Sequence, residues 1–109
     1  MRIENVPFQT IDWTTIPATV HRGETGEATW QTVELGNLRV RIVRYSAGYL
    51  ADHWCERGHA IHVLDGHLTT ELRDGRTFET PAGASYIVAT GDGAHRSRTQ
   101  LGAVLFIVD

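Results

Sequence analysis

The sequence predicts an all-β domain of antiparallel strands, arranged as a sandwich or a barrel. No stretch repeats apolar residues at the helical spacing i, i+3, i+4 and i+7 over more than two turns. Short apolar or alternating runs are instead separated by turns that contain glycine, such as Gly36-Asn37 and Asp65-Gly66. These runs recur at intervals of roughly 8–12 residues, a spacing typical of β-sandwiches and β-barrels.

The first 22 residues differ from the rest of the chain. Pro7 and Pro17 interrupt them. Their large apolar side chains are Phe8, Ile11, Trp13 and Ile16. We expect residues 1–22 to form an extended arm, which packs either over its own barrel or on a second subunit. Because a small β-domain has a limited core and must protect its edge strands, we predict a homodimer with exchanged arms.

Nine segments beyond the arm have the length and composition of strands. They are residues 27–35, 38–45, 52–56, 59–65, 67–73, 76–80, 84–90, 95–100 and 103–108. Gly36-Asn37 and Asp74-Gly75 favour tight hairpins between strands, because these residues accept positive φ at little cost. A chain of 109 residues has room for one domain, which we place at residues 1–109.

Composition and charge exclude several classes of function. Ten basic and thirteen acidic residues give a net charge of -3, which offers no basic surface for DNA or RNA. The opening residues lack the apolar run of a signal peptide, and the longest apolar run, Ala103–Val108, is too short to cross a bilayer. Cys55 is the only cysteine, so no internal disulfide forms. We therefore expect a cytoplasmic domain with neither a nucleic-acid nor a membrane partner.

Histidines near the lone cysteine are the best candidates for chemistry. His53 and Cys55 are two residues apart on a predicted strand, so the pleat would point both to one face. His59 and His95 each open a further strand. Imidazole nitrogen and thiolate suit zinc, copper, nickel or ferrous iron rather than magnesium or calcium. Spacing alone leaves the alternative open that the cysteine packs as an apolar residue and the histidines are only hydrogen-bonded.

The glycines around these residues resemble the two motifs of the cupin family. The first motif corresponds to Gly48-x4-His53-x-Cys55-x3-His59-x6-Gly66, in which cysteine replaces the second histidine of the family and His59 replaces its glutamate. The second motif corresponds to Gly83-x5-Ala89-x-Gly91-x3-His95. A rival register, Gly75-x5-Pro81-x-Gly83, places Tyr86 at the histidine position. We prefer His95, because it opens a strand after a glycine turn.

The resemblance covers about residues 36–108 and implies a cupin-type antiparallel β-barrel, also called a jelly roll or double-stranded β-helix. The run Asp52-His53-Trp54-Cys55 contains the residue types of the DHCW-motif cupins, in a different order. This subgroup lends a fold and a site but no substrate. Carried over residue by residue, the family's ligand set becomes His53, Cys55, His59 and His95. We expect it to bind one divalent transition metal, with zinc first and nickel or iron as rivals.

Three functions stay open at this point. The favoured one is a metal-binding protein that holds a small organic ligand, with Tyr45, Tyr49 or Tyr86 at the rim of the ligand pocket. A metal-dependent oxygenase or isomerase is the second, and a structural or sensory protein with a closed four-ligand zinc site is the third. Arg39 and Arg41 alternate with apolar residues, and we expect them on a solvated face.

Overall fold

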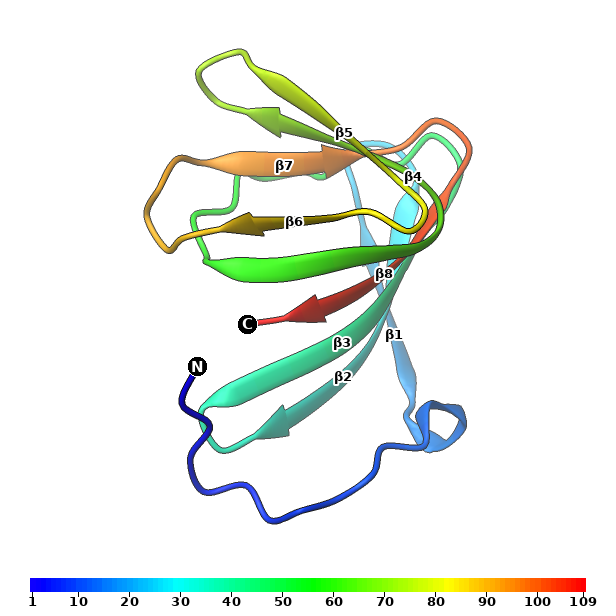
Figure 1. Ribbon diagram of the computed structural model, residues 1–109. Helices are drawn as coiled ribbons and strands as arrows, with labels where there is room; N and C mark the ends of the chain where they lie inside the picture. Colours follow the sequence, from blue (N-terminus) through cyan, green and yellow to red (C-terminus); the bar gives the residue numbers. More distant parts are fainter.

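The computed structural model covers residues 1–109 and consists almost entirely of antiparallel strands (Figure 1). The elements are η1 (Trp13–Thr15, a short 3-10 helix), β1 (Ala18–Arg22), β2 (Glu27–Leu35), β3 (Leu38–Tyr45), β4 (His59–Leu72), β5 (Thr77–Pro81), β6 (Ser85–Val88), β7 (His95–Arg98) and β8 (Ala103–Val108). The all-β fold class predicted from the sequence is confirmed. No helix has the length and apolar character needed to cross a membrane.

The long strand β4 joins the two halves of the molecule. The strands pair in the order β1-β2-β3-β8-β4-β5, and β6 and β7 also pair with β4. The first half of β4 lies between β8 and β6, and its second half lies between β5 and β7. The strand can serve both halves because its register shifts between Val63 and Asp65, and such a bulge bends and twists a strand. The result is a jelly roll whose pairing is not closed into a complete barrel.

Gly66 allows this bend. Its φ is +77°, a region that favours glycine, and a Cβ atom there would collide with the carbonyl oxygen of Gly102. The sequence predicts two strands, 59–65 and 67–73, with a turn at Asp65-Gly66. The structure corrects this expectation, since the chain continues through Gly66 as one bulged strand.

The apolar core lies between the two halves. Val43, Val63, Leu68 and Leu105 are its largest fully buried side chains. The alternation along β8 places every second residue in this core, while the residues between them are half-buried. The polar end of the interior, where β4 and β7 begin, carries the candidate site.

The arm packs on the outer face of its own domain. Gln31 of β2 donates hydrogen bonds from Nε2 to the carbonyl oxygens of Trp13 (2.7 Å) and Ile16 (3.0 Å). Ile42 of β3 pairs with Gln31 in the sheet, so its side chain lies on the same face, and it is only 7% exposed. The arm is shorter than expected from the sequence, because residues 18–22 pair with β2 as the edge strand β1. Phe8 remains 99% exposed.

The segment 52–56 is not the strand that the sequence predicted. It is irregular and meets the sheet only at Cys55, which forms an isolated bridge with His95. Two backbone hydrogen bonds make this bridge, from Cys55 N to His95 O (2.7 Å) and from His95 N to Cys55 O (2.9 Å). The alternating pleat of a strand therefore does not determine where the side chains of His53 and Cys55 point.

Candidate metal centre and cavity

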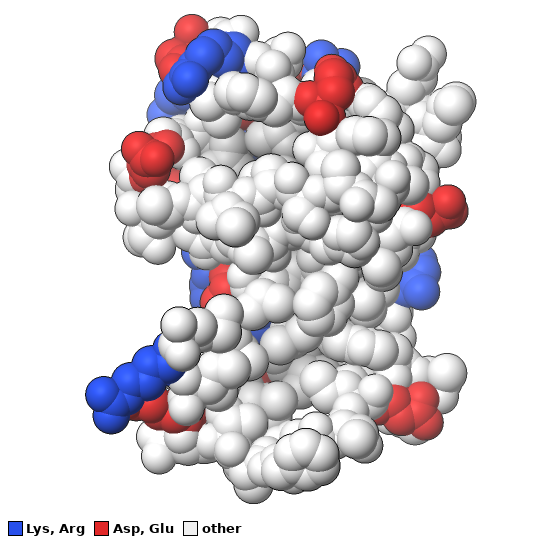
Figure 2. All heavy atoms as spheres, viewed as in Figure 1, with Lys and Arg blue, Asp and Glu red and all other residues white.

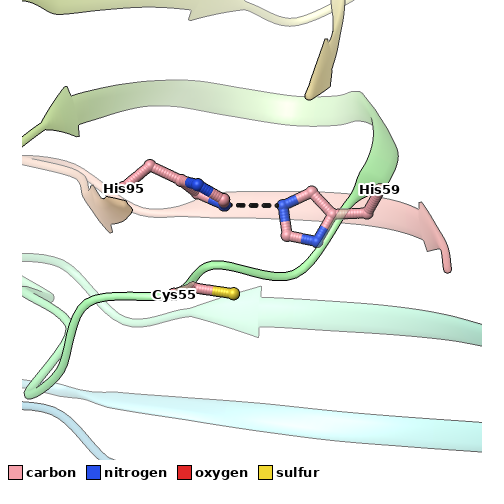
Figure 3. A group of neighbouring side chains, drawn as sticks. All are labelled: Cys55, His59 and His95. Carbon is pink, nitrogen blue, oxygen red and sulfur yellow. Dashed lines mark hydrogen bonds between the residues drawn. The ribbon is translucent and has the colours of Figure 1, made fainter. Parts of the chain in front are cut away.

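Three of the four predicted ligands gather at one place. The ligand atoms of Cys55, His59 and His95 all lie within 4.8 Å of one another. Figure 3 shows their side chains converging from three segments of the chain. His59 is the first residue of β4, His95 is the first residue of β7, and the isolated bridge holds Cys55 beside His95.

The two imidazoles already have the separation of two ligands on one ion. Nε2 of His59 and Nε2 of His95 are 3.0 Å apart, and the rings meet edge to face. Ligands about 2.0–2.1 Å from a metal, at cis octahedral or tetrahedral angles, lie about 2.9–3.4 Å from each other. The sulfur of Cys55 accepts a hydrogen bond from the backbone N–H of Arg57 at 3.4 Å.

Burial keeps His59 uncharged. Desolvation, reinforced by the nearby His95, lowers the pKa of His59 to about 4. The imidazole is therefore neutral at neutral pH, the form that binds metals. With a thiol and a second imidazole beside it, this donor set fits a divalent transition metal.

The carboxylate of Asp109 lies behind His59. Its Oδ2 atom is 3.5 Å from Nδ1 of His59, a buried atom without a hydrogen-bond partner. This places a carboxylate on the far side of an imidazole whose Nε2 faces His95. Carboxylates in this position orient the histidine ligands of many metal sites.

Asp109 is itself held by two arginines of β3. Its side chain is 1% exposed and accepts bonds from Arg39 Nε (2.7 Å), Arg39 Nη2 (3.0 Å) and Arg41 Nη2 (3.0 Å). Burial raises the pKa of Asp109, but the bond from Arg39 and the charges of both arginines outweigh it and hold the pKa below its usual value.

The expectation that Arg39 and Arg41 lie on a solvated face is wrong. Arg41 is 6% exposed and points into the domain, on the same face of β3 as the core residue Val43. Both faces of β3 are buried, since Val40 and Ile42 on the opposite face are each 7% exposed. The sequence contained one signal of a buried charge here. Leu105 and Ile107 alternate into the core along β8, and the same alternation places the acidic side chain of Asp109 inside.

His53 lies outside the group of three. Its side chain is 75% exposed, and its Nδ1 atom is 2.6 Å from Oδ1 of Asp52. It borders the cavity described below without approaching the other three ligands. The irregular backbone of 52–56 explains the difference, because it does not aim His53 and Cys55 to the same side.

A cavity of about 290 Å³ adjoins the three ligands, and Tyr45, Tyr49 and Tyr86 all line it. The rings of Tyr45 and Tyr49 are stacked at 4.2 Å. The hydroxyl of Tyr86 lies 3.4 Å from Nε2 of His59, and burial raises the pKa of Tyr86, so the phenol keeps its proton. Figure 2 shows the molecule hollowed between its upper and lower parts, with basic and acidic side chains visible in the hollow.

Two further histidines of β4, His62 and His67, lie away from this centre. His62 Nδ1 is 2.8 Å from the hydroxyl of Ser85, and His67 Nε2 is 3.1 Å from the carboxylate of Glu79. These side chains are hydrogen-bonded near the surface.

The sequence matches no family model and no curated protein. Solved structures, however, show the same fold. The polyketide cyclase RemF from Streptomyces resistomycificus is 21% identical, with a TM-score of 0.77 over 94% of this chain and 78% of that one. A sugar phosphate isomerase from a cupin superfamily, from Silicibacter pomeroyi, is 16% identical, with a TM-score of 0.69 over 92% of this chain and 74% of that one.

A cupin-2 domain protein from Shewanella frigidimarina is 19% identical, with a TM-score of 0.59 over 71% of this chain and 74% of that one. The chain is therefore a small domain with the cupin fold, and the fold implied by its motifs is confirmed. The similar structures include enzymes.

Proposed function

We propose that this protein binds one divalent transition metal through Cys55, His59 and His95 and holds a small organic ligand in the adjoining cavity. The observation that carries the proposal is the convergence of three ligand atoms within 4.8 Å at the wall of a 290 Å³ cavity. A thiolate with two imidazoles is a donor set that zinc accepts readily. Nickel and ferrous iron are the rivals, and their availability decides among them.

Catalysis is the second candidate function, and the number of gathered ligands favours it. Catalytic zinc sites use three protein ligands and keep a further position for water or substrate, whereas structural sites are closed by four. A bound metal of this kind supplies Lewis-acid polarisation of a substrate oxygen. The residues around it would exclude water, and the protonated Tyr86 would donate a hydrogen bond to the substrate. The reaction class that this supports is a metal-dependent isomerisation of a small organic molecule. Oxygenation would require ferrous iron in place of zinc, with dioxygen as the oxidant.

The closed zinc site is less well supported. It needs His53 as the fourth ligand, and that side chain is largely exposed and paired with Asp52. Joining the group would break this pairing and move the irregular segment that carries it.

Metal analysis tests the proposal directly. The native protein, purified without an affinity tag or added metal, should contain about one metal ion per chain by elemental analysis. His59→Ala and His95→Ala should lose the metal. His67→Ala is the matched control, since it removes a histidine of the same strand β4 that is paired with Glu79. Full metal occupancy in His95→Ala would contradict the proposal.

Two further variants decide the ligand number. Retention of metal in His53→Ala supports three ligands and an open position, and its loss supports the closed site. Loss of metal in Cys55→Ala assigns the sulfur as a ligand. If Cys55→Ala keeps its metal while His59→Ala and His95→Ala lose theirs, the sulfur has only a packing role.

A further inference from the structure

The cavity beside the three ligands carries an excess of positive charge. Its lining includes four arginines and three histidines but no aspartate or glutamate. The arginines are Arg39, Arg41, Arg57 and Arg96. Arg96 pairs with Glu71 at 2.8 Å, whereas the other three share the single carboxylate of Asp109, so positive charge remains in excess.

Arg41 is the arginine of this cavity with a buried, unpaired donor. Its side chain is 7% exposed, and its Nε–H is buried without a partner. Its one hydrogen bond, from Nη2 at 3.0 Å, goes to an Asp109 oxygen that also accepts a bond from Arg39. Desolvation and the charge of Arg39 lower the pKa of Arg41, and the Asp109 carboxylate, which it shares with Arg39, compensates its charge only in part. A buried donor and a buried charge are costly until an anion pairs with them.

The surroundings fix the orientation of this guanidinium. It lies 4.5 Å from the centre of the Trp30 ring, a cation–π contact that holds its plane. Oδ2 of Asp109 links it to the metal centre, since the same atom is 3.0 Å from Arg41 Nη2 and 3.5 Å from His59 Nδ1. An anion on Arg41 would therefore lie close to the three candidate ligands.

We propose that the cavity binds a small organic carboxylate, with its carboxylate group paired to Arg41 beside the metal centre. This names the ligand class of the proposed function and rests on that function for the role of the metal. The planar fork of a guanidinium matches the two oxygens of a carboxylate. The rings of Trp30, Tyr45 and Tyr49 provide apolar walls for the rest of the molecule. A volume of about 290 Å³ lies at the lower end of the range for small-molecule pockets.

Calorimetric titration with benzoate and with its neutral analogue benzamide tests this proposal. Both the zinc-loaded and the chelator-treated protein should bind benzoate. We expect benzamide to bind at least about tenfold more weakly, because hydrogen bonds to charged groups are the stronger ones. Arg41→Gln should lose at least about tenfold in benzoate affinity for the same reason. Arg44→Gln is the matched control on the outer face of the same strand, where the arginine is exposed and bonds Gln31, and it should bind benzoate normally.

Several results would overturn the proposal. Equal benzoate affinity in Arg41→Gln and the unaltered protein would do so, as would equal affinity for benzoate and benzamide, or tighter binding of inorganic phosphate. Benzoate binding that is lost on chelation but kept in Arg41→Gln would place the anion on the metal instead. If Arg41→Gln does not fold, the comparison of benzoate with benzamide on the unaltered protein still decides.

The metal content of the same samples separates this proposal from the previous one. A protein that contains no metal but binds benzoate through Arg41 refutes the metal site alone. Metal retained in Arg41→Gln with benzoate binding lost supports both.

Discussion

Replacing Asp109 by asparagine should remove a large share of the stability of the domain. The carboxylate is 1% exposed and accepts three hydrogen bonds from Arg39 and Arg41. The amide keeps the shape but not the charge, so both buried guanidinium groups lose their counter-ion. Breaking a buried ion pair by removing one partner costs about 3–5 kcal/mol. Because Arg39 is 17% exposed and regains some water, we expect about 3 kcal/mol.

Chemical denaturation followed by tryptophan fluorescence measures this loss. For a domain of this size about 3 kcal/mol corresponds to a fall of roughly 10–20 °C in the melting temperature. Asp65→Asn is the control, because Asp65 is exposed and should change the free energy of unfolding by no more than about 0.5 kcal/mol. An Asp109→Asn protein as stable as the control would refute the assignment of Asp109 as the buried counter-ion.

The same pair of proteins predicts a pH dependence. The pKa of Asp109 is lower in the folded protein than its ordinary value of 3.8, so the carboxylate stabilises the fold fully above that value. The stabilisation is lost as the pH falls below 3.8 towards the folded pKa. The difference in free energy of unfolding between the unaltered protein and Asp109→Asn should therefore be constant near neutral pH and shrink in acid. A difference that grows below pH 4 would contradict this linkage.

Three further predictions concern the core, the metal and the assembly. Leu105→Ala should cost about 2–5 kcal/mol in urea denaturation, because Leu105 is fully buried in the core, whereas Leu101→Ala, at an 86% exposed position, should cost little. Chelation should lower the melting temperature of the metal-loaded protein but not that of His95→Ala, since a ligand bound only to the folded state stabilises it. The full chain should be a homodimer by light scattering at micromolar concentration, and removal of residues 1–17 should give a monomer or an insoluble chain, because the exposed Phe8 would otherwise lack an apolar contact. A monomeric full chain would contradict the dimer.

Local sequence chemistry determined much of the fold. The strands 27–35, 38–45 and 103–108 have the bounds expected from alternation and turn residues, because both signals act between neighbours in the chain. The glycine pattern around the histidines led to the cupin fold. It also pointed to Cys55, His59 and His95, which the structure brings together.

Tertiary structure decided the remaining features of the site. His53 lies outside the group because the backbone of 52–56 is irregular, which no spacing rule reveals. Arg41 points inward on a strand that is buried on both faces, so alternation could not tell which face meets water. Its partner Asp109 is 68 residues away along the chain. Periodicity reports only whether side chains share a face, and the charge of the cavity depends on which faces the folded chain encloses together.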